Sequence, residues 1–295
     1  MALRPFVQVD VFADRPGAGN PLAVVPDATG LDDAAMQAIA RWTRLPETTF
    51  VFPPTRPGAS YAIRMFSPAR EVPFAGHPSV GTAHVVLEAG LAAPDPAGLL
   101  WQEGVAGVLP LRVEVADGVR RISIRTPRAS LVETADARGA RMAEALDWLP
   151  TGQLPPALMD GGRRWWVAEA RDEASLRNAR PDWDAIAGLA RATGSMGVLA
   201  FARCGGADYQ IAARAFVGGP AIFEDAASGA ANATLAAWLA LRDALPGRGG
   251  RYRVSQGREV GYDARLDMHV DEDGEVWSGG RVVSVVRGQI DWPQP

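Results

Sequence analysis

Few residue types in this chain are available for acid–base or nucleophilic chemistry. It has one cysteine, Cys204, and three histidines, His77, His84 and His269, and all 30 of its basic residues are arginine. The absence of lysine excludes a Schiff-base lysine and a P-loop lysine. A single cysteine excludes an intramolecular disulfide and a cysteine-cluster zinc site, and we interpret Cys204 as a buried structural thiol. We therefore expect carboxylates, with at most one histidine, to perform any catalysis.

Three polar residues stand where acid–base chemistry is possible. Glu47 opens the strand-like segment ETTFVF after a predicted helix, and His77 and Asp225 each precede a further predicted helix. A helix N-terminus presents unpaired N–H groups and a partial positive charge, so it binds carboxylates. Each residue also has a structural interpretation without catalysis. Glu47 could be a surface glutamate, His77 a hydrogen-bonded loop histidine and Asp225 a helix N-cap. The neighbouring residues are small and would let an anion approach the backbone: Gly76, Gly81, Gly229 and Ala230.

A metal-dependent hydrolase is a further alternative that the spacing does not favour. His77 and His84 lie seven residues apart, and the sequence contains no HExxH-type motif. We therefore expect no metal ligands in this chain.

The elements that must position these residues are short strands with few helices. LDDAAMQAIARWTR has a helical apolar stripe and ends before Pro46, while FVQVDVFA and YAIRMFSP alternate as strands do. AGHPSVGTAHVVLEAG predicts a helix with Pro78 at its first position and Gly90 at its C-cap. The turns are rich in glycine and proline. This mixture favours an α+β fold over a repeating βαβ sheet.

A weak internal repeat relates the two halves of the chain. Arg64-Met65-Phe66 resembles Arg214-Ala215-Phe216, and each is followed by a loop and a predicted helix. His77 precedes Gly81 by four residues, as Asp225 precedes Gly229. Each half would then contribute one helix N-terminus with a polar residue, although strand–loop–helix units are common enough for the match to be accidental.

Length and composition exclude several classes of protein. The chain has 295 residues, of which 47% are hydrophobic and 22% charged, as expected of a globular chain with one large or two smaller domains. No apolar stretch reaches the roughly 18 residues of a membrane span. A net charge of −4 argues against nucleic acid as a partner. The N-terminus, MALRPFVQVDVF, lacks the apolar core and cleavage site of a signal peptide, so we expect a cytoplasmic protein.

Several segments together are far more specific than any one residue. VDVFADRPGAGNPLAVV, LPETTFVF, FSPAREVPFAGHPSVGTAH, FEDAASGAANATLA and SQGREVG occur in this order across the chain. In this the chain resembles the phenazine biosynthesis PhzF-like isomerase family. The resemblance implies an α+β fold like that of diaminopimelate epimerase, with two pseudo-symmetric halves, each a curved, mostly antiparallel sheet around a central helix. The expected halves are residues 1–118, joined by a C-terminal strand at 281–295, and residues 119–280, with the active site in the cleft between them.

The resemblance also implies roles for individual residues. The family's catalytic glutamate falls on Glu47, its GHP histidine on His77, and the aspartate of its EDPATGSA-like segment on Asp225. The substrate-binding positions that it implies are Gly76, Ser228, Gly229 and Ala230. The characterised reaction of the family is a cofactor-independent proton shift in a cyclic dihydro-hydroxyanthranilate. The related epimerases use two cysteines, so a carboxylate must replace them in a chain that has only one.

The chain departs from the family pattern at several positions. Ala226, Ser228 and Ala230 replace proline, threonine and serine, and Tyr262 and Asp263 replace an Arg-Pro pair. The loss of the hydroxyl at Ala230 removes one group that would anchor a substrate carboxylate.

The leading interpretation is a cofactor-free isomerase acting on a small carboxylate-bearing substrate, and the resemblance implies a homodimer. The alternative is a binding or interaction protein that retains the fold without turnover. Incubation with candidate cyclic amino acids or hydroxy acids discriminates conversion from binding alone.

Overall fold

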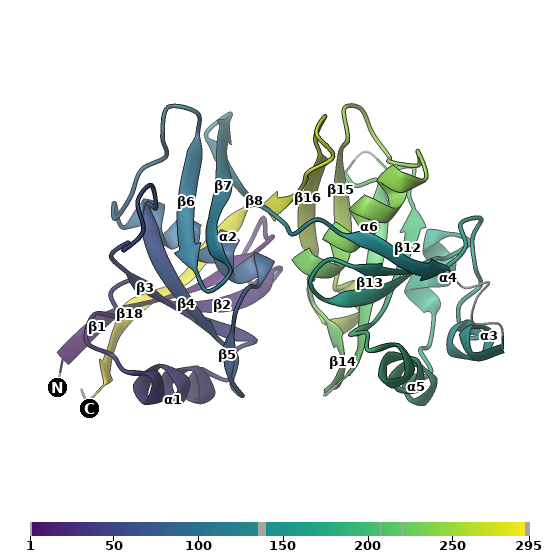
Figure 1. The fold of residues 1–295 in the computed structure, drawn as a ribbon, viewed down its shortest axis with the longest axis horizontal. Coiled ribbons are helices and arrows are strands. Elements are labelled where there is room, and N and C mark those ends of the chain that lie inside the picture. The colour runs from purple at the N-terminus through teal and green to yellow at the C-terminus, as the bar shows by residue number, and fades with distance from the viewer. Residues whose placement is uncertain (1, 135–139, 207, 220, 293–295) are drawn as a thin grey trace. The chain divides into compact units, whose positions relative to one another are not determined.

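The computed structural model describes residues 2–134, 140–206, 208–219 and 221–292 (Figure 1). Its contacts divide the chain into two units. The first comprises Met1–Arg125 with Gly279–Pro295, and the second comprises Thr126–Ser278. The strand at 119–125 therefore belongs to the first unit rather than the second, because it pairs with the preceding strand from Leu111 to Ala116. Within the described residues, no helix has the length and apolar character needed to cross a membrane.

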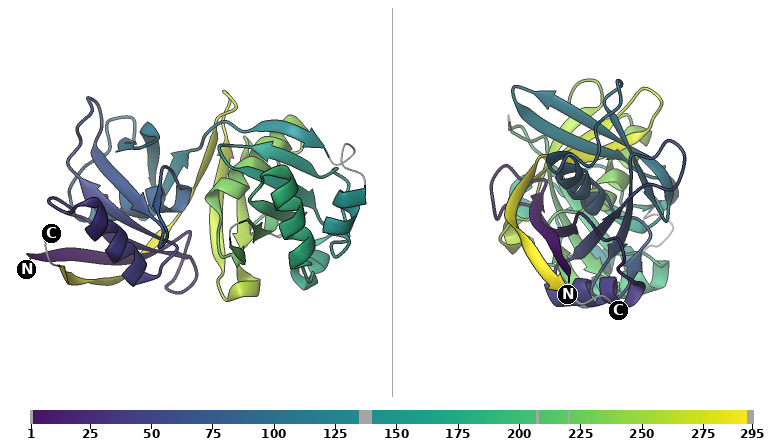
Figure 2. Two further views of the ribbon diagram at one scale, coloured as in Figure 1. Left: turned by 60° about the horizontal axis from the view of Figure 1, so that its bottom comes forward. Right: turned by 90° about the vertical axis from the view of Figure 1, so that its left-hand side faces the viewer.

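The first unit is a sheet with one helix inside it and one outside. It contains β1 (Ala2–Val11), β2 (Asn20–Val25), α1 (Asp33–Thr43), β3 (Glu47–Phe52), β4 (Tyr61–Phe66), β5 (Glu71–Val72), α2 (Gly76–Glu88), β6 (Leu99–Gly104), β7 (Gly107–Ala116), β8 (Val119–Arg125) and β18 (Val282–Trp292). β18 pairs antiparallel with β1, and Figure 2 shows these two strands side by side. β2 pairs parallel with β3, β3 antiparallel with β4, and β4 pairs with both β5 and β6.

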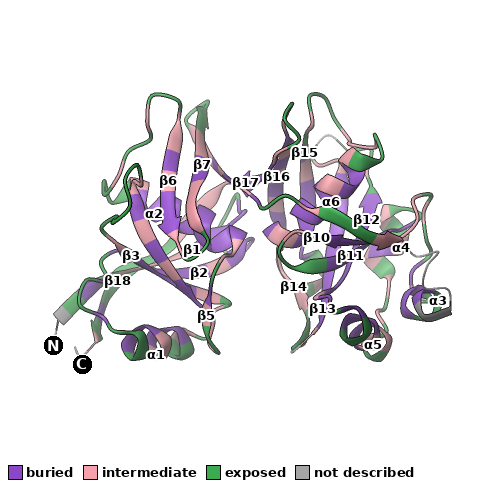
Figure 3. Ribbon diagram, viewed as in Figure 1, coloured by how far each residue is buried: buried purple, intermediate pink, exposed green. Residues whose placement is uncertain are grey.

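The central helix of the first unit is α2. It packs against β1, β2, β3, β8 and β18, and Figure 3 shows it largely buried. Gly81 permits this close packing, because a Cβ at this position would lie 2.6 Å from Leu22 and 2.7 Å from Val11. The predicted helix start is wrong by two residues: α2 begins at Gly76, and Pro78 is its third residue. Proline is tolerated there because N–H groups of the first turn have no helical partner.

The second unit repeats this arrangement. It contains β9 (Ser130–Thr134), α3 (Ala140–Leu146), β10 (Ala157–Asp160), β11 (Arg164–Glu169), α4 (Glu173–Asn178), α5 (Trp183–Thr193), β12 (Gly197–Arg203), β13 (Ile211–Gly218), β14 (Ile222–Asp225), α6 (Gly229–Leu241), β15 (Arg251–Gln256), η2 (Arg258–Val260) and β16 (Ala264–Val270), and β17 (Val276–Gly280) leads back to the first unit. β11 pairs parallel with β12, β12 antiparallel with β13, and β13 pairs with both β14 and β15. α6 is the buried central helix and packs against β10, β11, β12 and β16. The predicted fold, a curved sheet around a central helix in each half, is confirmed.

Candidate active site

Glu47 and His77 lie together in the first unit. Glu47 is the first residue of β3, where the parallel pairing with β2 begins opposite Leu22, and His77 is the second residue of α2. His77 Nε2 lies 3.3 Å from Glu47 Oε2, and the two side chains are 9% and 16% exposed. The geometry at Nε2 is not that of a hydrogen bond, and this buried nitrogen has no such partner among the described residues. The structure therefore brings two of the predicted catalytic residues into direct contact.

The His77 imidazole is neutral at pH 7. Burial lowers its pKa from 6.5 to about 3, because the charged form loses its hydration in the protein interior. Its contact with Glu47 is accordingly not an ion pair. A neutral imidazole can hydrogen-bond to a carboxyl group or a substrate, in a tautomer set by its partners.

The N-terminus of α2 has backbone donors for an anion. Ala75 is the N-cap, and no side chain caps this end of the helix. Pro78 has no N–H, so the donors of the first turn that precede it belong to Gly76 and His77. The helix dipole adds a partial positive charge at this end. A carboxylate bound here would lie beside the contact between Glu47 and His77.

Acid should destabilise the protein through His77. In the folded state His77 stays unprotonated down to about pH 3, whereas in the unfolded chain it takes up a proton near pH 6.5. The stability associated with neutral His77 is thus present above pH 6.5 and is lost as the pH falls, by up to about 1.4 kcal/mol per pH unit. Urea unfolding at pH 7 and pH 5 measures this loss, which should shrink in His77→Asn. Burial lowers the pKa of His84 as well, while the charge of Glu88 opposes this shift, so His84→Asn should also reduce the loss, but by a smaller amount. An unchanged pH dependence in His77→Asn would contradict the prediction.

The remaining predicted residues lie together in the second unit. Asp225 ends β14, and its Oδ1 accepts a hydrogen bond from the Ala227 N–H at 3.2 Å. Burial raises the pKa of Asp225, and the hydrogen bonds from the Ala227 N–H and the Ser228 hydroxyl partly oppose this effect. Gly229 and Ala230 are the first two residues of α6, so their N–H groups belong to its open first turn.

The interpretation of Asp225 as the N-cap of the second predicted helix is wrong. α6 begins at Gly229, and Ser228 is its N-cap, with Oγ accepting from the Ala231 N–H at 3.4 Å. Asp225 is instead held in the ladder between β14 and β13, opposite Ala215. Both aspartate and serine are good N-caps, so the sequence contains two acceptable helix starts and strand pairing selects the later one.

The repeat between the two units also has a different register from the predicted one. Glu71 lies five residues before Gly76 and Glu224 five before Gly229, and each glutamate pairs across its hairpin with the phenylalanine of the Arg-x-Phe motif. In this register Asp225 corresponds to Val72, and His77 corresponds to Ala230. The polar site residues of one unit therefore correspond to apolar residues in the other unit.

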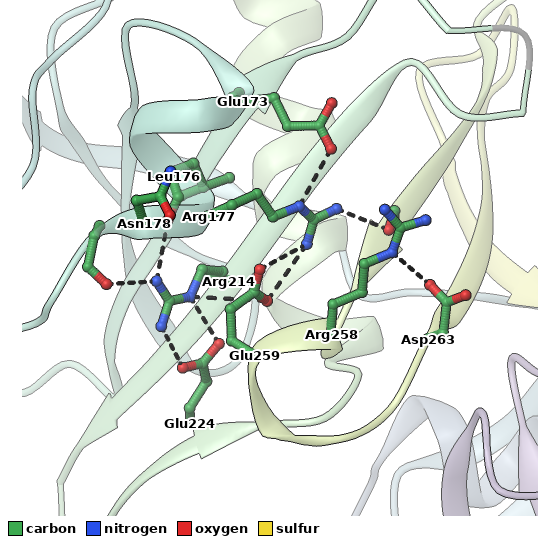
Figure 4. Close-up of polar contacts among 12 residues, drawn as sticks. Glu173, Leu176, Arg177, Asn178, Arg214, Glu224, Arg258, Glu259 and Asp263 are labelled. Carbon is green, nitrogen blue, oxygen red and sulfur yellow. Dashed lines mark hydrogen bonds and ion pairs between the residues drawn. The ribbon is translucent and has the colours of Figure 1, made fainter.

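An arginine in each unit fixes the hairpin that leads to the central helix. Arg214 Nε and Nη2 donate to the two carboxylate oxygens of Glu224 at 2.9 and 2.8 Å (Figure 4). The Arg214 guanidinium also lies 4.8 Å from the centre of the Phe216 ring. Arg64 makes the same bidentate contact with Glu71, at 2.7 Å for both bonds. The repeated Arg-x-Phe motif indicated this pair of sites, but not the glutamates.

Sequence reasoning missed the buried amides beside Asp225. Gln256 ends β15, and Asn232 lies in the first turn of α6; the two form a hydrogen bond at 2.8 Å. The SQG segment was the available signal for Gln256. Among the described residues, no cluster of three or more His, Cys, Asp or Glu side chains could hold a metal ion.

Solved structures of other proteins share this fold. A proline racemase structure from Agrobacterium radiobacter superposes with a TM-score of 0.62, covering 98% of this chain and 93% of that one, at 14% identity. This likeness concerns the fold alone. A phenazine biosynthesis protein of the PhzF family from Bacillus anthracis has the same fold, with a TM-score of 0.81 at 23% identity and coverage of 99% and 100%.

The sequence comparisons identify the family. The profile described as phenazine biosynthesis-like protein (PhzC-PhzF) matches residues 9–288. The chain is 32% identical to a trans-2,3-dihydro-3-hydroxyanthranilate isomerase of Pseudomonas aeruginosa over 92% of this chain and 91% of that protein. It is 30% identical to antisense-enhancing sequence 1 of Schizosaccharomyces pombe, with coverage of 98% and 99%. This chain belongs to the phenazine biosynthesis-like PhzC-PhzF family, and it is an enzyme of the PhzF isomerase kind.

Proposed function

We propose that this enzyme moves a proton within a small cyclic or amino-acid-like carboxylate by carboxylate acid–base catalysis. The observation that carries the proposal is the contact of Glu47 with a neutral, buried His77 beside the uncapped N-terminus of α2. Glu47 would take a proton from one carbon of a conjugated substrate and return it to another carbon of the same system. The substrate's electron pair shifts along the double bonds, so no cofactor or metal enters the reaction.

Each group of residues has a role in this proposal. Glu47 transfers the proton, and His77 and Asp225 orient Glu47 or the substrate. A substrate carboxylate would accept hydrogen bonds from N–H groups at a helix N-terminus, and Ser228 fixes the start of α6. The carboxylate-binding residues are then Gly76, Ser228, Gly229 and Ala230. We also propose that the protein is a cytoplasmic homodimer.

The substrate class is tested with the compound that the Pseudomonas aeruginosa relative is named for. Trans-2,3-dihydro-3-hydroxyanthranilate is incubated with the protein in D₂O, and proton NMR follows both its conversion and the entry of deuterium at carbon. Conversion with deuterium at the new C–H position supports the proposal. Binding in calorimetry without conversion or deuterium entry would favour the alternative of a binding protein that retains the fold.

A serine at position 230 should tighten carboxylate binding. Ala230 is the second residue of α6 and stands where the family pattern has serine. One added hydrogen bond to a charged group contributes about 1.5–3 kcal/mol, so Ala230→Ser should lower the Kd for anthranilate about tenfold or more. Isothermal titration calorimetry measures the change. Ala237→Ser, on the same helix but away from its N-terminus, is the control and should bind as the unaltered protein does. A carboxylate found on an arginine, with the α6 N–H groups unused, would contradict this prediction.

A further inference from the structure

The side chain of Gln256 forms hydrogen bonds with the end of β14, the turn that follows it and the start of α6. Its side chain is fully buried. Nε2 donates to the main-chain oxygen of Asp225 at 2.9 Å, and Oε1 accepts from the Ser228 N–H at 3.3 Å. Oε1 also accepts from Asn232 Nδ2 at 2.8 Å. One amide therefore ties together the end of a strand, the N-cap and the first turn of a helix.

The orientation of this amide is determined by its partners. A flipped amide would place its oxygen against the Asp225 carbonyl and its NH₂ against the Ser228 N–H, so that two acceptors and two donors would face each other. Asn232 strengthens the arrangement, because its Nδ2 donates to the Ser228 oxygen at 2.9 Å. The three hydrogen bonds of Gln256 join residues 24 to 31 positions apart in the sequence.

The residue after Gln256 packs against the same turn. Gly257 has a φ of 93°, and a Cβ at this position would lie 2.3 Å from the Ala226 carbonyl oxygen. Any other residue here would both adopt an unfavourable backbone conformation and push the turn away. The end of β15 thus packs against the turn between β14 and α6 through the side chain of Gln256 and the backbone of Gly257.

The turn in the second unit lacks a restraint that its counterpart has. In the register set by Glu71 and Glu224, Pro73 corresponds to Ala226. Proline fixes its own φ, so Pro73 limits the conformations of the turn before α2. Alanine does not restrict the turn before α6 in this way. The order of the second turn therefore depends more strongly on hydrogen bonds from outside it.

We infer that Gln256 is the positioning residue of the second group of site residues. It holds Asp225 and the N–H groups at the start of α6 in the geometry that receives the substrate carboxylate. This inference rests on the proposed function, in which those groups bind or orient the substrate.

The first test is local hydrogen–deuterium exchange in Gln256→Met. Methionine has a similar length but lacks all three hydrogen bonds, so the amide protons of the peptide Asp225–Asn232 should exchange at least about tenfold faster. Thr193→Val is the matched control. Thr193 is also buried and has three side-chain hydrogen bonds, to Trp166, Leu189 and Ser195, but it lies at the end of α5. Exchange in the Asp225–Asn232 peptide of this control should equal that of the unaltered protein.

The second test is function in the same two variants. Gln256→Met should weaken anthranilate binding about tenfold and raise KM more than it lowers kcat for trans-2,3-dihydro-3-hydroxyanthranilate, whereas Thr193→Val should change neither. If Gln256→Met does not fold, Gln256→Glu retains the acceptor for Ser228 and Asn232 but replaces the donor to Asp225 with a carboxylate oxygen that faces the Asp225 main-chain oxygen. Unchanged local exchange, or faster exchange with unchanged binding and KM, would overturn the inference. A protein that neither binds nor converts these compounds, yet shows the local exchange effect, would overturn the proposed function and leave the structural role of Gln256 established.

Discussion

Replacing Glu47 with glutamine should lower turnover by at least about 100-fold while leaving the fold intact. Glutamine keeps the size of the side chain and its hydrogen-bonding capacity but cannot accept a proton from carbon. Positioned acid–base groups typically contribute about 10²- to 10⁴-fold in rate, so this substitution removes the full effect. Turnover of trans-2,3-dihydro-3-hydroxyanthranilate is the measurement, and circular dichroism verifies the fold.

An exposed glutamate provides the control for Glu47. Glu144 lies on the surface of α3, and Glu144→Gln makes the same chemical change away from any predicted site residue. We expect its turnover to equal that of the unaltered enzyme. His77→Asn should also reduce turnover, by a smaller factor, because His77 orients a partner rather than transferring the proton. Near-normal turnover in Glu47→Gln would remove this residue from the mechanism.

Replacing Arg214 with methionine should reduce the free energy of unfolding by about 3–5 kcal/mol. The Arg214 and Glu224 side chains are each only 6% exposed, and Arg214 Nη1 also donates to the main-chain oxygens of Leu176 and Ala179. Removing one partner of a buried ion pair leaves the other charge without compensation in the protein interior, and this is the source of the large loss. Urea unfolding followed by fluorescence measures it.

Two comparisons separate this loss from simple changes in packing. Adding Glu224→Leu to Arg214→Met removes the uncompensated charge and should restore much of the stability. Arg64→Met disrupts the corresponding ion pair in the first unit, whose side chains are 30% and 32% exposed. Because this pair is more exposed, the loss in free energy of unfolding should be about 1 kcal/mol. Equal losses for Arg64→Met and Arg214→Met would contradict burial as the cause.

Local sequence signals predicted the parts of the site that depend on short-range structure. Pro46 and the β-branched run after it correctly placed Glu47 at the start of β3. The GHP segment placed His77 just before the helix, whereas His77 is the second residue of α2. The start of α6 was misplaced because Asp225 and Ser228 are both competent caps, and pairing with β13 decides between them. Gln256 could not be found in this way, because its role arises from contacts with residues far earlier in the chain.

The polar site residues occupy different positions of the repeat in the two units. In the proposed mechanism this separates proton transfer from recognition of the substrate carboxylate. Glu47, the proposed proton-transfer residue, and its neighbour His77 belong to the first unit, while the positions that depart from the family pattern, Ala226 and Ala230, belong to the second. Substitutions in the turn before α6 can therefore change which carboxylate is accepted without altering the acid–base group. We expect members of the family to diverge in substrate mainly through this turn and through the residues that support it, so that one unit preserves the proposed chemistry while the other changes its specificity.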